Sequence, residues 1–375
     1  MTNLENFLAV MEYKTPDQVP NWEAGVWAQT IDRWENEGLD RRLLCWDWFT
    51  GEDYFGFDNR EFIPINLSML PYFPEKVIEK TDKYEIIRNN IGIVTKALLE
   101  GSVGRARMSM DQYLSFPVET NEDFEALKYR YTASHTARYE TGWKEFRLPG
   151  WKNRKHPLIA GQNCSTAGFY WRAREWMGTE NLSFAWYDDP VLCDNMMEFT
   201  ADFTIEVLKP VLDAVAPDYI CINEDMSMKS GPLLSPEHYL RYIYPHMRRL
   251  VDFVKSKGTR YVIVDTDGSP GPLIPLLLKA GVDAIWPVER AGENMDPIEL
   301  RAKYGRDLRL WGAVDKRCLA QGKDAIDKHL RSLIPLIEEG GFIPTVDHTV
   351  PPDVSLENFT HYIKQKKKLL SGEAF

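Results

Sequence analysis

Short apolar runs alternate with longer amphipathic segments throughout the second half of the chain. The apolar runs lie at 217–226, 259–268, 282–289, 308–316 and 342–350. Each run is apolar on both faces, which is typical of strands in a parallel sheet that helices cover. A helix-like segment follows each run; the first begins after Ser235 with Pro236 and ends before Gly258, the residue types that favour helix ends. The pattern predicts five consecutive strand–helix units.

The first half of the chain has a weaker pattern. It predicts strands at 19–25 and 156–163, a hairpin at 84–99 that turns at Asn89 and Asn90, and helices within 120–150 and 190–215.

These elements predict one α/β domain, a (β/α)8 TIM barrel that spans residues 1–375. Residues 1–150 would form an elaborated N-terminal region with the first strands, and residues 151–375 the main barrel. A doubly wound open sheet is the structural alternative, because it shares the alternation of strands and helices.

In a TIM barrel the active site lies at the carboxyl ends of the strands, so the polar residues that end each predicted strand are candidates. These residues are Gln162, Asn163, Glu224, Asp225, Asp265, Asp267, Glu289, Asp315, Lys316, Asp347 and His348. Clustered carboxylates repel one another, and their desolvation is costly without a counter-charge. A divalent metal would supply that charge; Asp, Glu and His suit zinc, with manganese or magnesium as alternatives.

We predict Asp267, Glu289 and His348 as the metal ligands, with Asp265 as a competitor for the place of Asp267. Three protein ligands leave a fourth position open for substrate, which is the pattern of catalytic zinc. A structural histidine is the alternative for His348.

Three further acids are predicted to act as catalytic or metal-tuning groups: Asp265, Glu224 and Asp315. Asp265 and Asp315 also have a simpler interpretation. An aspartate at a strand end before a turn often serves as a turn or cap residue, which applies to Asp265. Asp315 precedes Lys316, so a local ion pair is an equally good reading.

Aromatic residues are frequent in the N-terminal region and around 169–176. Most of them are expected in the core, and some are expected to line a flat apolar pocket over the barrel mouth. The predicted substrate-binding residues are Trp22, Trp27, Arg105, Gln162 and Tyr170, with Arg105 as a candidate for binding a substrate carboxylate.

Composition narrows the classes of function. The chain has 45 basic and 56 acidic residues and a net charge of −11, which argues against a binder of nucleic-acid backbones. The five cysteines contain no C-x-x-C pair, which favours reduced thiols in a cytoplasmic protein. No apolar stretch is long enough to span a bilayer, and the first residues do not have the pattern of a secretory signal.

Several segments resemble the uroporphyrinogen decarboxylase superfamily in order along the chain. They are SPEHYLRYIYPHMRRL, VIVDTDGSPGPLIPLLLKAGVDAIWPVE, LRLWGAVDKRCLAQG and GGFIPTVDHTVPPDVSLENF. The resemblance implies a (β/α)8 barrel. It also implies one of two reactions: metal-free decarboxylation of a tetrapyrrole, or zinc-dependent methyl transfer to or from a corrinoid protein.

The chain departs from the decarboxylases where they bind substrate. Their arginine-rich segment after the first strand, a Trp followed by Met-Arg-Gln-Ala-Gly-Arg, is NWEAGVWAQT here, with Glu23 in place of a cation. His348 does match a histidine that those enzymes keep in the last barrel turn. The zinc methyltransferases carry His-x-Cys-Gly after the fifth strand and a Cys in the last turn; the segment from Asp265 to Gly268 and His348 stand at those places.

The resemblance therefore predicts a zinc-dependent methyltransferase with oxygen and nitrogen ligands in place of thiolates. A harder site is a stronger Lewis acid toward oxygen, which favours a methoxylated, aromatic methyl donor and an O-demethylase role. The acceptor would be a corrinoid (cobalamin-binding) partner protein, and a homodimer is possible. The alternatives are a metal-free decarboxylase, with His348 as proton donor, and a non-catalytic barrel that binds a corrinoid protein or a tetrapyrrole.

Overall fold

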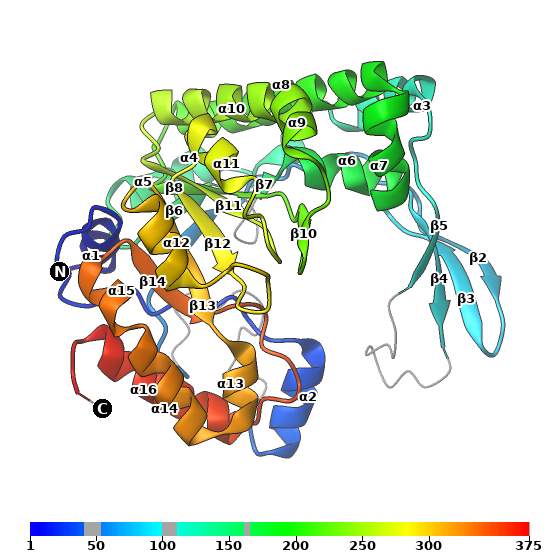
Figure 1. Cartoon of the computed structure of the whole chain (residues 1–375). Helices are drawn as coiled ribbons and strands as arrows, with labels where there is room; N and C mark the ends of the chain where they lie inside the picture. Colours follow the sequence, from blue (N-terminus) through cyan, green and yellow to red (C-terminus); the bar gives the residue numbers. More distant parts are fainter. Residues whose placement is uncertain (41–53, 100–110, 161–165, 375) are drawn as a thin grey trace.

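A curved parallel sheet forms the centre of the computed structural model, which describes residues 1–40, 54–99, 111–160 and 166–374. Its strands are β1 (Glu61–Ile63), β6 (Leu158–Ala160), β7 (Thr166–Ala167), β8 (Tyr219–Asn223), β11 (Tyr261–Asp265), β12 (Ala284–Val288), β13 (Arg309–Val314) and β14 (Phe342–Val346). The strand order is β1-β6-β8-β11-β12-β13-β14, with β7 paired to β8, and all pairs are parallel. Figure 1 shows the curvature of this sheet.

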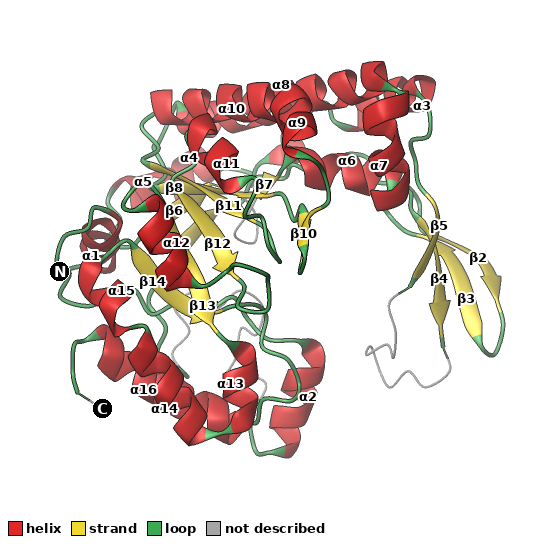
Figure 2. Cartoon of the chain, in the orientation of Figure 1, coloured by secondary structure: helices red, strands yellow, loops and turns green. Residues whose placement is uncertain are grey.

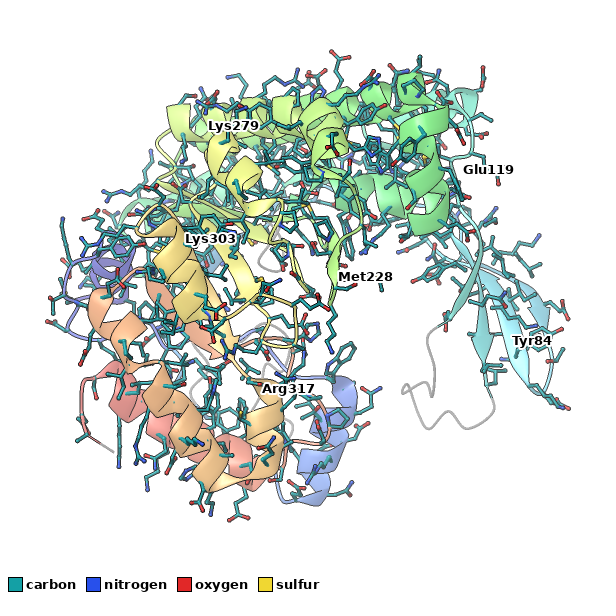
Figure 3. The ribbon with its side chains drawn as sticks, viewed as in Figure 1. Tyr84, Glu119, Met228, Lys279, Lys303 and Arg317 are labelled. Atoms are coloured by element: carbon teal, nitrogen blue, oxygen red, sulfur yellow. The ribbon has the colours of Figure 1, made fainter. Side chains whose placement is uncertain are left out.

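Helices surround the curved sheet, and most of them follow a strand and lie on its outer side (Figure 2). They are α1 (Asn3–Met11), α2 (Ala28–Asn36), α6 (Phe169–Met177), α7 (Thr179–Asp188), α8 (Pro190–Leu212), α9 (Pro236–His238), α10 (Tyr244–Ser256), α11 (Ile274–Ala280), α12 (Pro297–Tyr304), α13 (Lys316–Gln321), α14 (Lys323–Ser332), α15 (Ile334–Glu339) and α16 (Leu356–Leu370). Helix α8 packs beside α10, and α14 beside α16. Among the described helices, none combines the length and apolar character that a membrane span needs.

The five strand–helix units predicted from the second half of the chain are confirmed. Ser235 accepts the backbone N–H of His238 at the start of α9, and a π-helical turn (Tyr239–Ile243) joins α9 to α10. The helix expected after 322 is divided into α14 and α15, because Pro335 has no N–H to continue the helical hydrogen bonds.

The strand predicted at 19–25 is wrong as a regular strand. This segment makes one parallel bridge, between Val26 and Val350, and the backbone carbonyl of Asn21 accepts the N–H of Asp58. Pro20 has no N–H, and the segment is held instead by side-chain bonds. The segment therefore lies between β14 and β1. The described sheet follows a TIM-like path of seven strands, and this segment, which was predicted as a further strand, is irregular.

A buried ion pair fixes this irregular segment. The carboxylate of Glu23 accepts Lys366 Nζ at 2.7 Å, the Tyr362 hydroxyl at 2.5 Å and the N–H of Val346 at 2.7 Å. Glu23 and Lys366 are fully buried, so the attraction between their charges is weakly screened by solvent. Glu23 is therefore a structural residue in this chain.

The N-terminal region carries a second, antiparallel sheet that projects from the main body (Figure 1). Its strands are β2 (Lys76–Lys80), β3 (Tyr84–Arg88), β4 (Val94–Leu98) and β5 (Gln112–Ser115), in that order. The hairpin predicted at 84–99 is β3–β4. The helices expected within 120–150 are short: α3 (Asn121–Leu127), α4 (Trp143–Phe146), α5 (Leu148–Lys152) and two 3₁₀ turns (Lys128–Arg130 and Thr136–Arg138).

An aromatic cluster fills the interior of the curved sheet. Phe7 of α1 packs against Trp22 and Tyr219 with ring centroids 5.5 and 5.4 Å apart, and Trp311 packs on both Trp22 and Tyr219. Trp22, predicted as a substrate-binding residue, is only 1% exposed and belongs to this core. Helix α1 therefore closes the interior at the amino-terminal end, and the opposite end is left for the site.

Candidate active site

A cavity of about 190 Å³ opens at the carboxyl ends of β8, β11, β12 and β14. Its polar lining comes from Asn223, Asp225, Asp265, Asp267 and His348, and its aromatic lining from Trp171 and Trp286. Strand alternation explains which side chains reach it. Residues two apart on a strand face the same side, so Asn223 follows Tyr219 and Cys221 into the interior, and Asp265 follows Tyr261 and Ile263.

Three larger hollows, two of about 530 Å³ and one of about 430 Å³, lie elsewhere on the described part of the molecule. The first is lined by Leu4 and by Arg260, which directly precedes β11, the second by Tyr13 and Leu370, and the third by Tyr187. Arg260 marks the amino-terminal side of the strands, where TIM barrels hold stabilising rather than catalytic residues. The cavity of about 190 Å³ at the carboxyl ends of the strands is therefore the better candidate for the active site.

Asp265 is the most buried acid of the cavity. It ends β11, where it pairs with Asn223 of β8 and Trp286 of β12 in the sheet register. Burial raises the pKa of Asp265 well above the usual range of an aspartate, and the nearby charges of Asp267 and Asp225 raise it further. Within the described part of the chain, no side-chain hydrogen bond or ion pair forms at its carboxylate.

Asp267 and His348 form a pair beside Asp265. The Nε2 atom of His348 lies 3.2 Å from Oδ2 of Asp267, and this hydrogen bond is the main reason that the pKa of His348 is raised. The indole of Trp27 stacks on the His348 ring at 6.1 Å and is itself 48% exposed. His348 therefore lies between the cavity and an exposed aromatic ring, in surroundings that favour its protonated form.

Asp225 is held by an arginine. The Nη2 atom of Arg174 lies 2.6 Å from Oδ2 of Asp225, and Nη1 also donates to the Asp225 carbonyl oxygen. The backbone of Asp225 has a φ of 36°, in the left-handed region that residues other than glycine rarely adopt. Strain of this kind is common where the chain aims a side chain at a site.

Glu289 is bound by other groups, although its charge is close enough to raise the pKa of His348. One carboxylate oxygen accepts Lys316 Nζ at 2.7 Å, and the other accepts the N–H of Gly268 at 2.8 Å. In the part of the chain that the structure describes, no three His, Cys, Asp or Glu side chains are grouped to hold a metal ion. The structure thus brings together two of the three predicted ligands, but not the third. Zinc binding by these residues stays a prediction.

The other predicted catalytic acids lie outside the cavity lining. Glu224 is fully buried and accepts the N–H groups of Phe169 and Tyr170 at the start of α6; burial raises its pKa to about 7. Asp315 accepts the N–H of Arg317 at the start of α13 and pairs with the Arg317 guanidinium at 2.7 Å. Both carboxylates are therefore engaged in helix capping, and their catalytic role stays a prediction.

The predicted substrate-binding residues have different positions. Trp27 stacks on His348, whereas Tyr170 is buried and does not line the cavity. Arg105 and Gln162 lie outside the described residues. The sequence prediction missed Asn223 and Trp286. The two-residue period of a strand was the signal for both. It places Asn223, rather than Glu224, on the interior face of β8, and it places Trp286 on the interior face of β12 with Ala284.

Comparisons with known proteins match this fold. Residues 166–369 match the family model described as "Uroporphyrinogen decarboxylase (URO-D)". The uroporphyrinogen decarboxylase of Picosynechococcus sp. is 25% identical over 175 residues, which cover 44% of this chain and 47% of that protein. That of Prochlorococcus marinus (strain MIT 9312) is 28% identical over 140 residues, 36% of this chain and 38% of that protein. The matched region thus spans less than half the length of these relatives.

A solved structure extends the likeness of the fold to nearly the whole chain. The methyltransferase from Methanosarcina mazei has a TM-score of 0.60 at 13% identity, and the match covers 98% of this chain and 99% of that one. At this identity the likeness concerns the fold. The family match, by contrast, covers more than half of the chain in sequence. The chain therefore belongs to the uroporphyrinogen decarboxylase family.

Proposed function

We propose that this chain is a methyltransferase that moves a methyl group from a methoxylated, aromatic substrate to a corrinoid carried by a separate protein. The observation that carries the proposal is the Asp267–His348 pair at the mouth of a cavity walled by Trp171 and Trp286. It places a proton donor beside flat aromatic surfaces that suit a methoxylated ring. The methyltransferase from Methanosarcina mazei has the same fold, so the fold is compatible with this reaction.

The reaction needs an acid at the leaving oxygen. The methyl carbon is transferred to the corrinoid, which supplies the nucleophile, and the electron pair of the broken C–O bond stays on the oxygen. His348, whose pKa the hydrogen bond to Asp267 raises, would stabilise that oxygen and donate the proton.

The proposal includes zinc only if the carboxylate of Glu289 leaves its present partner. A three-ligand site of Asp267, His348 and Glu289 would require Glu289 to exchange its ion pair with Lys316 for the metal. The residues as placed do not form that site, so the chemistry above rests on the acids of the chain itself.

A metal-free decarboxylase is the second candidate, favoured by the names of the matching relatives and by the unpaired acid Asp265. Two observations oppose a tetrapyrrole substrate. The cavity of about 190 Å³ is smaller than the roughly 300–1,000 Å³ usual for ligand pockets. Moreover, no Lys or Arg is among the described residues that line it, whereas a substrate with several carboxylates needs cations.

The two candidates predict different products from one protein preparation. The chain would be incubated with reduced cobalamin and a series of methoxylated phenols, and separately with aromatic and tetrapyrrolic acids. Methyl transfer predicts methylcobalamin and a free phenol, lost in His348→Gln but kept in the control His361→Gln, which lies on α16. Carbon dioxide release with no methylated corrinoid would favour the decarboxylase instead.

A further inference from the structure

Two hydrogen-bond acceptors face the cavity without a partner among the described residues. Asp265 is 9% exposed, and its carboxylate makes no hydrogen bond or ion pair there. The Oδ1 atom of Asn223 is buried and likewise has no hydrogen-bond partner in that part of the chain. The two residues end neighbouring strands and stand directly opposite each other in the register of β8 and β11. A buried unpaired acceptor is costly, so a ligand with donor groups would satisfy both.

The charges around the cavity leave one carboxylate uncompensated. Asp225 pairs with Arg174 at 2.6 Å, and Asp267 pairs with His348 at 3.2 Å. Among the described residues Asp265 has no such partner, and no Lys or Arg is found in the cavity lining. A ligand with one cationic group would supply the partner that Asp265 lacks there.

The walls of the cavity favour an organic cation over a metal ion. Trp171 and Trp286 line it, and the faces of tryptophan rings attract cations. The Arg174 guanidinium already lies over Trp171, 4.5 Å from the ring centroid, so we expect a ligand cation to contact Trp286. Trp286 stands beside Asp265 in the register of β11 and β12. A metal ion would need at least three grouped ligands, and the described side chains form no such group.

We infer that the ligand of this cavity is a small organic monocation whose N–H groups bind the Asp265 carboxylate and Asn223 Oδ1. A protonated amine on a compact aromatic or aliphatic body has the required charge, donors and size. The inference deepens the proposed function, on which it rests for the claim that this ligand is turned over: the methyl donor carries an ammonium group as well as its methyl group. Binding itself does not depend on methyl transfer.

Three probes of similar shape but different charge test whether the charge of the ligand decides binding. They are meta-methoxybenzylamine, which is cationic at neutral pH, meta-methoxybenzyl alcohol, which is neutral, and meta-methoxybenzoate, which is anionic. Calorimetric titration would compare the wild-type chain, Asp265→Asn, Asn223→Ala and the control Asp252→Asn, an exposed acid on α10 that pairs with Arg248. Thermal melts of each variant would confirm that it is folded.

The wild type and Asp252→Asn are expected to bind the amine at least about tenfold more tightly than the alcohol, and the benzoate least. Asp265→Asn should lose the preference for the amine, and Asn223→Ala should weaken it. Equal binding of amine and alcohol, a preference that survives in Asp265→Asn, or no binding of the amine by the folded wild type would each overturn the inference. If the amine binds as expected but no methyl reaches reduced cobalamin, the proposed function fails and the ligand class stands.

Discussion

Lys316 and Glu289 form an ion pair at the carboxyl ends of β12 and β13. Nζ lies 2.7 Å from Oε1, while the second carboxylate oxygen accepts the N–H of Gly268. Both side chains are largely buried, which strengthens the pair relative to one on the surface. The ammonium group of Lys316 thus pairs with the glutamate that was predicted to bind a metal.

Removing that cation should strengthen zinc binding if Glu289 is a latent ligand. Lys316→Met frees the carboxylate for the Asp267–His348 pair, and we expect zinc affinity to rise about tenfold. Competition with a chelating dye would measure it, with Lys323→Met as control because its ion pair with Glu357 is exposed. An unchanged affinity, or a gain that survives the added change Glu289→Gln, would show that Glu289 is not a ligand.

Asp265→Asn should stabilise the fold at neutral pH, because it removes a buried carboxylate that has no partner in the described structure. The expected gain in unfolding free energy is on the order of 1–3 kcal/mol. Since the folded pKa of Asp265 is raised, the wild type loses stability as pH rises from the ordinary aspartate pKa of about 4 through the raised value.

The gain from Asp265→Asn should therefore be small in acid and larger at neutral pH. Urea unfolding of both proteins across this pH range would measure it. A variant that is less stable than the wild type at every pH would contradict a charged, unpaired Asp265.

Asp267→Asn should lower the pKa of His348, because the hydrogen bond to the Asp267 carboxylate is the main cause of its rise. The stability that this pair contributes is present below the ordinary histidine pKa and is lost as pH rises through the raised value. Titration of the histidine ring signals by NMR would follow the shift. Asp327→Asn, next to His361 on α16, is the matched control and should leave His348 unchanged.

Gly168→Ala should disturb the end of β8. A Cβ at this position would lie 2.5 Å from the carbonyl oxygen of Asn223 and would also collide with the Glu224 carboxyl group. Overpacking of this kind costs on the order of 1–3 kcal/mol. Gly150→Ala is the control, since its Cβ meets nothing within 4 Å. Equal stability of the two variants, measured by urea unfolding, would argue against close packing at Gly168.

The sequence was most informative where structure is local. The strands of the second half follow from their apolar runs, and the cap at Ser235 follows from residue type. The irregular segment at 19–26 could not be predicted, because Glu23 finds its partners more than 300 residues away in Val346, Tyr362 and Lys366.

The candidate site was predictable in place but not in its pairings. The barrel pattern placed Asp265, Asp267 and His348 at one mouth, and all three line one cavity in the structure. The engagement of Glu289 by Lys316, and of Glu224 by the start of α6, depends on tertiary contacts that spacing alone does not reveal. Strand alternation alone would have favoured Asn223 over Glu224.

The most direct test of the proposed function follows an isotopically labelled methoxy methyl group in the presence of reduced cobalamin. We predict that the label appears on the corrinoid in step with release of the phenol. We also predict that His348→Gln slows methyl transfer and phenol release about a hundredfold. Label that stays on the substrate while carboxylic acids lose carbon dioxide would contradict methyl transfer and establish a decarboxylase.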